Sequence, residues 1–203
     1  MMPPKAKITR DMILQTVLEI TRESDFAAVN ARSIAGKLLC STRPIFTCYD
    51  NMEELKKEFL DFAYAYYEQY VSRYQQTGEV DPSLVWPLSY LAFAQEETPL
   101  FKLLFITEMD LEMTSPKDFY KEPGNQEKAE RFAKTIGVGL EQAKDIFLDI
   151  FLYAHGMAVL TATQKMALDR SSAENRLRHM LTALIEAEKS DGSYEEIKGS
   201  ERV

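Results

Sequence analysis

The sequence predicts an all-α protein, and three features of the chain indicate this class. Residues 30–55 compress two short helical patterns and a turn into one segment, and a third helical pattern follows at once. Beyond it, apolar side chains recur at helical spacing in one segment after another. Turn-forming pairs such as Thr77-Gly78 and Asp81-Pro82 separate these segments. We therefore expect a small N-terminal domain of three helices, followed by a larger helical domain.

The first two helices are predicted from apolar spacing and from a capping residue. The first carries Ile13, Val17 and Ile20 on one face and is followed by Phe26. The second begins at Asn30, whose side-chain oxygen can accept a free N–H group of the first turn. Its apolar face consists of Ile34, Ala35 and Leu38.

A turn and a further short helix follow directly. Leu39-Cys40 is the predicted turn, and Ser41 is the predicted N-cap. Pro44 then falls within the first helical turn, where its missing N–H has little effect. We expect the buried side of this helix to consist of Ile45, Phe46 and Tyr49.

The next helix extends as a connecting helix over about residues 52–75. Asn51 and Glu54 form a capping-box pattern at its start, with asparagine in place of serine or threonine. Its apolar residues lie four, three and four positions apart: Leu55, Phe59, Phe62 and Tyr66.

Two short helices joined by a tight turn match the helix-turn-helix pattern. In that motif, the N-terminal residues of the second helix enter the major groove of DNA and contact bases or phosphates. The residues in those positions here are Ser41, Thr42, Arg43 and Thr47. Arg43 can pair with guanine or bind a phosphate, and Arg32 and Lys37 on the preceding helix suit backbone phosphates. The alternative is a plain helical hairpin in an all-α core.

The segment resembles the DNA-binding domain of the TetR/AcrR family of transcriptional regulators. That family shows a Thr, an Ile-Ala pair, a Leu-Gly-Val-Ser turn, a Tyr-x-x-Phe ending and then Lys-Glu-x-Leu. The corresponding residues here are Asn30, Ile34-Ala35, Leu38-Leu39-Cys40-Ser41, Phe46-Thr47-Cys48-Tyr49 and Met52-Glu53-Glu54-Leu55. These motifs lie within about residues 8–70, and the rest of the chain is similar to the family only in size and helical character.

Three departures from the family pattern concern this segment. Leu39 replaces the usual turn glycine, so the turn must avoid a left-handed residue there or carry strain. Phe46 replaces a tyrosine and Met52 replaces a lysine, and both of the usual residues commonly contact phosphate in the family. Lys56 and Lys57, one turn later, could partly replace those contacts.

The resemblance also implies a ligand pocket in the middle of the chain, lined by large aromatic and flexible side chains. The candidates are Trp86, Tyr90, Phe105, Met109, Phe147, Phe151 and His155. Each of them can equally be ordinary core, and a lone histidine on an apolar helix is usually a satisfied core group. A pocket with so few polar groups would bind a hydrophobic or amphipathic molecule.

Two long helices are predicted near the C-terminus, over about residues 140–168 and 172–189. The first is apolar on more than one face, which indicates burial on several sides. The two helices could fill the core of one chain or pair with a second copy in a four-helix bundle. The resemblance implies the second arrangement, a homodimer that presents two recognition helices to successive major grooves.

The net charge of −8 is unevenly distributed along the chain. Residues 1–60 hold nine Lys/Arg and eight Asp/Glu, whereas residues 61–203 hold fifteen and twenty-four. The N-terminal part is therefore nearly neutral. Binding of this part to DNA should be salt-sensitive and should require two copies of the domain.

Other classes of protein find little support in the sequence. No Gly-rich phosphate loop, Gly-x-Ser-x-Gly, His-Glu-x-x-His or paired-cysteine zinc pattern occurs, so we expect no enzyme, no metal site and no cofactor. We also predict no signal peptide and no transmembrane segment, and hence a cytoplasmic protein. Cys40 and Cys48 are either small apolar fillers or a thiol redox switch.

Together these features predict a DNA-binding domain over residues 1–55, a ligand-binding and dimerisation domain over 76–189, and a flexible tail over 190–203. The expected function is a dimeric transcriptional regulator, a repressor that an unknown small-molecule effector releases from a double-stranded DNA operator. The alternative is an all-α small-molecule-binding or interaction protein that has lost specific DNA binding.

Overall fold

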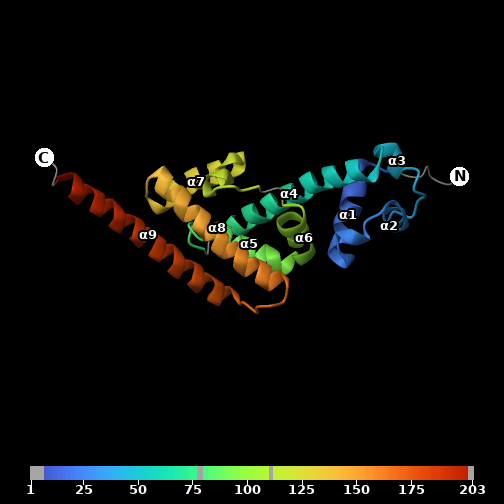
Figure 1. The fold of residues 1–203 in the computed structure, drawn as a ribbon. Coiled ribbons are helices and arrows are strands. Elements are labelled where there is room, and N and C mark those ends of the chain that lie inside the picture. The colour runs from blue at the N-terminus through green and yellow to red at the C-terminus, as the bar shows by residue number, and fades with distance from the viewer. Residues whose placement is uncertain (1–6, 77–79, 110–111, 201–203) are drawn as a thin grey trace. The chain divides into compact units, whose positions relative to one another are not determined.

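The computed structural model describes residues 7–76, 80–109 and 112–200, and all regular elements in these ranges are helical (Figure 1). The predicted all-α class is confirmed. The elements are, in chain order, α1 (Arg10–Ser24), η1 (Phe26–Ala28), α2 (Ala31–Lys37), α3 (Ile45–Cys48), α4 (Met52–Gln76), α5 (Val85–Glu96), α6 (Thr98–Lys102), η2 (Leu103–Thr107), η3 (Pro116–Lys121), α7 (Pro123–Ile136), α8 (Leu140–Ala162) and α9 (Arg170–Ser200).

The chain forms two compact units. The first consists of Met1–Tyr70 and Glu96–Met109, and the second of Val71–Gln95 and Asp110–Val203. The predicted ligand-binding and dimerisation domain, residues 76–189, includes residues 96–109, which the structure places in the first unit. Their ionic and aromatic contacts join them to α1 and α4 of the first unit.

Two ionic contacts attach this segment to the first unit. The Glu97 carboxylate accepts hydrogen bonds from Arg22 Nε at 2.7 Å and from the Tyr66 hydroxyl at 2.8 Å. At the other end, Lys56 Nζ lies 2.7 Å from Glu108 Oε1. Glu108 directly follows η2, which is a π-helical turn. The segment is thus held before α6 and after η2.

The core of the first unit is built by the four helices α1 to α4. Its fully buried side chains include Ile13, Val17, Ile34, Ile45, Leu55 and Phe59. Phe26 of η1 stacks on Phe59, with ring centroids 5.6 Å apart. Burial of each such side chain stabilises the fold by roughly 1.5–3 kcal/mol. The predicted apolar faces of these helices are confirmed at these positions.

The start of α2 is capped as predicted by Asn30. The Asn30 Oδ1 atom accepts the N–H groups of Arg32 and Ser33, each at 3.0 Å. In return, Ser33 Oγ accepts the Asn30 N–H at 3.0 Å. This reciprocal capping box fixes the start of a helix of only seven residues.

The turn after α2 is closed by a Schellman motif. The Leu39 N–H donates to the Gly36 carbonyl at 3.3 Å, and the Cys40 N–H donates to the Ala35 carbonyl at 3.0 Å. Leu39 has a φ of 51°, in the left-handed region that favours glycine, and its side chain is 88% exposed. Without a glycine, the turn could either avoid a left-handed residue or carry strain. The positive φ of Leu39 shows that it carries strain.

α3 is a single helical turn and starts later than predicted. Its N-cap is Pro44, which makes no side-chain cap, so the prediction of Ser41 as N-cap was wrong. An N-cap side chain accepts a backbone N–H from the residue two or three positions later. Three positions after Ser41 lies Pro44, which has no N–H. The carbonyls of the two residues before Pro44 accept the N–H groups of Phe46 and Thr47, at 3.3 and 3.0 Å. The helical register therefore extends back over these residues.

The prediction that Phe46 is buried was also wrong. Ile45 and Tyr49 are buried as expected, whereas the Phe46 side chain is 49% exposed. Positions four apart share a face of a helix, but the next position along the chain lies about 100° around it. A core that covers Ile45 and Tyr49 therefore leaves Phe46 outside.

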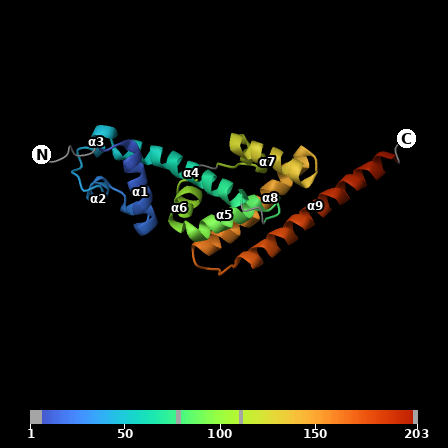
Figure 2. The ribbon, with the colours of Figure 1, turned by 180° about the vertical axis from the view of Figure 1, so that it is seen from behind.

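In the second unit, α8 packs against both α7 and α9 (Figure 2). Phe132 of α7 contacts Phe147 of α8, with ring centroids 5.5 Å apart. α8 ends before the predicted boundary near residue 168, because Gln164 takes a left-handed φ of 57° and closes a second Schellman motif. α9 continues to Ser200, beyond the predicted end of the helix near residue 189.

α8 is also the one helix among the described residues that is long and apolar enough to cross a membrane. Its mean hydropathy reaches 1.4 over an 18-residue window, and 50% of that window is buried inside the protein. Such burial is typical of a core helix, which passes the same test of length and composition.

Replacing Leu39 by glycine should stabilise the protein. Glycine adopts a left-handed φ without the Cβ clash, so we expect the free energy of unfolding to rise by about 1 kcal/mol. Urea unfolding followed by circular dichroism measures the change. Leu39→Ala is the matched control, since it shortens the exposed side chain but keeps the Cβ. Equal stabilisation by both substitutions would show that the backbone conformation is not the cause.

Candidate nucleic-acid interface

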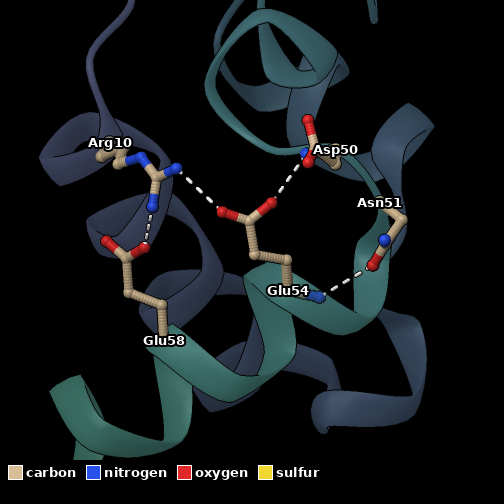
Figure 3. Close-up of polar contacts among 5 residues, drawn as sticks. All are labelled: Arg10, Asp50, Asn51, Glu54 and Glu58. Carbon is tan, nitrogen blue, oxygen red and sulfur yellow. Dashed lines mark hydrogen bonds and ion pairs between the residues drawn. The ribbon is translucent and has the colours of Figure 1, made fainter.

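Arg10, at the start of α1, binds the start of α4 (Figure 3). Its guanidinium donates to Glu54 Oε1 at 2.8 Å, also binds Glu58, and lies 4.4 Å from the centroid of the Tyr49 ring. The hydrogen bond with Glu54 raises the pKa of Arg10. The Asp50 N–H, and then Arg10, lower the pKa of Glu54. The charged forms of both partners are therefore favoured.

The same Glu54 closes the first turn of α4 (Figure 3). Its carboxylate accepts the Asp50 N–H at 2.7 Å, and its own N–H donates to Asn51 Oδ1 at 2.9 Å. The predicted Asn51–Glu54 cap is thus confirmed in one direction only, because the returning bond goes to Asp50. These bonds fix the chain between α3 and α4.

Tyr49 anchors the end of α3 in the core. Its ring is 2% exposed, and its N–H donates to the Ile45 carbonyl at 3.0 Å. Burial and the Glu58 carboxylate raise the pKa of the Tyr49 hydroxyl. Because Ile45 and Tyr49 both point inward, the opposite side of this turn faces solvent.

Three side chains share that outward side: Arg43, Phe46 and Thr47. All three are exposed. Arg43 precedes the other two by three and four residues, the spacing of neighbours on one helix face. Ser41 is exposed and Thr42 half-buried just before this turn. The outward face therefore combines a cation, hydroxyl groups and an aromatic ring.

Two of the predicted phosphate-binding lysines are engaged by carboxylates of the same unit. Lys37 Nζ lies 3.0 Å from Glu19 Oε2 and 2.8 Å from Glu23 Oε1. The hydrogen bond with Glu23, followed by that with Glu19, raises the pKa of Lys37. Lys56 is held by Glu108 in the pair described above. The carboxylates offset much of the attraction of these two lysines for phosphate.

Arg32 and Arg43 differ from the lysines in this respect. Both are exposed, and neither has an ion-pair partner within the described part of the chain. Arg32 lies in the first turn of α2, and Arg43 lies just before α3. The structure thus leaves Arg32 and Arg43, unlike Lys37 and Lys56, without a carboxylate partner.

Most of the predicted pocket residues form an aromatic cluster in the second unit: Trp86, Tyr90, Phe147, Phe151 and His155. The Trp86 centroid lies 5.5 Å from that of Tyr90 and 5.3 Å from that of Phe147, and Phe151 stacks on His155 at 5.6 Å. The remaining two residues, Phe105 and Met109, belong to the first unit. There, the Phe105 ring packs against Tyr67 at 4.9 Å.

His155 supplies a polar group within this cluster. Its Nδ1 atom lies 2.9 Å from the Tyr90 hydroxyl. Burial lowers the pKa of His155, which favours the neutral imidazole. A phenol and a neutral imidazole among aromatic rings can bind a mainly apolar molecule that carries one hydrogen-bonding group. Because the rings already contact one another, such a molecule would have to separate them.

No local sequence pattern indicates the role of Arg10, since its partners Glu54 and Glu58 lie 44 and 48 residues away in the chain. Cys40 and Cys48 are both free thiols and half-buried. Within the described ranges, no group of three or more His, Cys, Asp or Glu side chains could hold a metal ion.

Comparison of the chain with protein-family models and with curated proteins finds no match.

Protonation of His155 should destabilise the protein. Its folded pKa lies below the ordinary value of 6.5, so stability that is present above this value is lost as the pH falls through it toward the folded pKa. We expect His155→Asn, which keeps a hydrogen-bonding group near the Nδ1 position, to lose less thermal stability than the parent between about pH 7 and pH 5. The matched control is His179→Asn on the exposed face of α9, which should retain the loss seen in the parent. Equal losses in the parent and His155→Asn would contradict this role.

Proposed function

We propose that the protein is a dimeric, DNA-binding transcriptional regulator of the cytoplasm, a repressor that a small hydrophobic or amphipathic ligand releases from its operator. The observation that carries this proposal is the pair of exposed, uncompensated arginines on α2 and at the start of α3. Thr42 lies beside Arg43 and can donate a hydrogen bond to a phosphate or a base, whereas the Thr47 hydroxyl donates to the Arg43 carbonyl at 3.0 Å. The resemblance of residues 8–70 to TetR/AcrR DNA-binding domains supports the same reading.

The geometry of α3 is suited to insertion into a groove. The turn is anchored by Ile45 and Tyr49, so its outward side chains stand on a rigid base. Arg43 has no carboxylate partner to leave before it binds a guanine edge or a phosphate. One such domain offers few cations to the DNA backbone, and useful affinity therefore requires two copies.

An apolar stripe on α8 supports dimerisation. Leu152 and Leu160 are 51% and 45% exposed, and the exposed Gly156 lies between them at the four-residue spacing of one helix face. On α9, which packs against α8, Met180, Leu184 and Ile185 are half-buried. A second copy covering these side chains would form a four-helix interface in which Gly156 permits close approach of the helices.

The aromatic cluster of the second unit is the proposed ligand site. Apolar walls with one phenol–imidazole pair favour a hydrophobic or amphipathic ligand over a highly charged metabolite. A thermal-shift screen tests this, because a ligand that binds only the folded state raises its stability. Stabilisation only by highly charged metabolites would count against the proposed class.

A second candidate function is an all-α small-molecule-binding or interaction protein that has lost specific DNA binding. The ion pairs of Lys37 and Lys56, together with the net charge of −8, favour it. Such a protein would show no sequence-specific, salt-sensitive binding to any fragment of its parent genome. The two functions are thus separated by one binding assay.

Removal of the Arg43 guanidinium should weaken DNA binding by about tenfold or more, because a bidentate base contact contributes about 1–3 kcal/mol. A gel shift with the DNA upstream of the protein's own gene measures this loss for Arg43→Ala. Arg32→Ala should weaken binding to all sequences similarly and lower the slope of log affinity against log salt by about one.

The matched control for these variants is Lys37→Ala. Its ammonium is already held by Glu19 and Glu23, so its loss should weaken binding less than the loss of Arg32. If Arg43→Ala binds as well as the parent, or if Lys37→Ala is the most damaging of the three, the assignment of the interface is wrong.

A charge on the α8 stripe should separate the dimer. Leu152→Glu would bury a carboxylate against the same residue of the second copy, and we expect the mass in solution to fall from twice 23.3 kDa to that of one chain. Sedimentation equilibrium measures the mass. Leu140→Glu, at an exposed leucine at the first position of α8, is the matched control and should remain dimeric. A parent protein that is monomeric at micromolar concentration would contradict the proposed interface.

A further inference from the structure

The exposed ring of Phe46 has no structural explanation within the first unit. Phe46 is a large apolar side chain that is 49% exposed. It lies in the one-turn helix α3, which is already anchored in the core by Ile45 and by the following Tyr49. It makes no aromatic contact with the residues that the structure describes. Apolar side chains of this size are stabilised by leaving water, so a partner surface would gain from covering it.

The surroundings of Phe46 indicate what kind of surface that is. Arg43 lies one helical turn before it on the same face, and Thr47 lies beside it. The arginine has no carboxylate partner within the described ranges. A protein surface that covered the ring would also have to bury or pair this charge. The major groove of DNA offers both an anionic backbone for the arginine and apolar groups for the ring.

The apolar group of the major groove is the 5-methyl group of thymine. An aromatic or aliphatic side chain in the groove can contact it, and no other base of DNA presents an equivalent group there. Phe46 carries no hydroxyl and cannot donate to a phosphate or a base edge. Its chemistry therefore suits methyl contact and does not suit the hydrogen bonding that a tyrosine in this position could make.

We propose that Phe46 is a specificity-determining residue that reads a thymine methyl group in the operator, next to the base or phosphate bound by Arg43. This inference rests on the proposed function, because it requires that the outward face of α3 enters a major groove. It goes further in naming the base that the ring selects. The operator should contain thymine at one position that cannot be replaced without loss, even by a base with the same hydrogen-bonding edge.

Replacement of thymine by deoxyuridine removes the methyl group and leaves base pairing unchanged, so it isolates the contact. Duplexes that bind the full-length protein are first selected from a random library. Each selected thymine is then replaced singly by deoxyuridine, and affinity is measured by fluorescence anisotropy. We expect one position per half-site to lose about fourfold in affinity, which corresponds to burial of one methyl group.

The protein variants complete a double-mutant cycle with the DNA. Phe46→Ala should bind the thymine and deoxyuridine duplexes equally, whereas Phe46→Tyr, which keeps the ring, should retain the preference for thymine. Circular dichroism checks that both variants fold; the side chain is half-exposed, so its truncation removes little of the core. Arg43→Ala should keep the methyl preference at lower overall affinity.

The outcomes separate this inference from the function on which it rests. If no DNA sequence is enriched, both are overturned. If a sequence is enriched but deoxyuridine binds as well as thymine at every position, or if Phe46→Ala keeps the preference for thymine, the DNA-binding function stands and the role of Phe46 is overturned.

Discussion

The burial of Ile45 and Tyr49 is the constraint on which the candidate interface depends. A helix of one turn has almost no stability of its own, because the first turn fixes several residues for a single hydrogen bond. α3 exists because both ends of the turn are held in the core of the first unit. Arg10 contributes from outside by covering the Tyr49 ring and binding Glu54 and Glu58 of α4. The direction in which Arg43 points therefore follows from contacts made by residues far away in the chain.

The carboxylates of the first unit decide which cations remain for a partner. Exposed ion pairs contribute only about 0–1 kcal/mol to stability, so their main effect here is electrostatic. Glu19 and Glu23 lower the attraction of Lys37 for phosphate, and Glu108 does the same for Lys56. Within residues 30–55, Arg32 and Arg43 are thus the two cations without a carboxylate partner. A surface of this kind favours selective contacts over general adhesion to nucleic acid.

Local sequence patterns were sufficient for the helical class, for the Asn30 cap and for the buried positions of α1. In α4 they identified Leu55 and Phe59, but they pointed to Phe62 and Tyr66 where the structure buries Ala63 and Tyr67. They failed where two apolar residues are adjacent, since hydrophobicity alone could not tell that Ile45 faces inward and Phe46 outward. Local patterns also could not show that Lys37 is paired with carboxylates whereas Arg32 is not, because those carboxylates are supplied by another helix, α1. The division of the predicted pocket residues has the same origin: Phe105 resembles its aromatic neighbours in sequence, but its tertiary contacts lie in the first unit.

The π-helical turn Leu103–Thr107 has a consequence for the charge of the first unit. A turn closed by bonds between residues five apart holds one residue more than an α-helical turn, and each helical residue rotates the chain by about 100°. In this turn the Glu108 N–H donates to the Leu103 carbonyl at 2.9 Å, and the Glu108 carboxylate reaches Lys56 in that register. If residues 103–107 formed a regular α-helix, the Glu108 carboxylate would lie on another side of the helix. Lys56 would then lose its ion-pair partner, and its ammonium group would face solvent. The extra residue in this helical turn therefore determines whether Lys56 is paired with Glu108 or is free to bind an anionic partner.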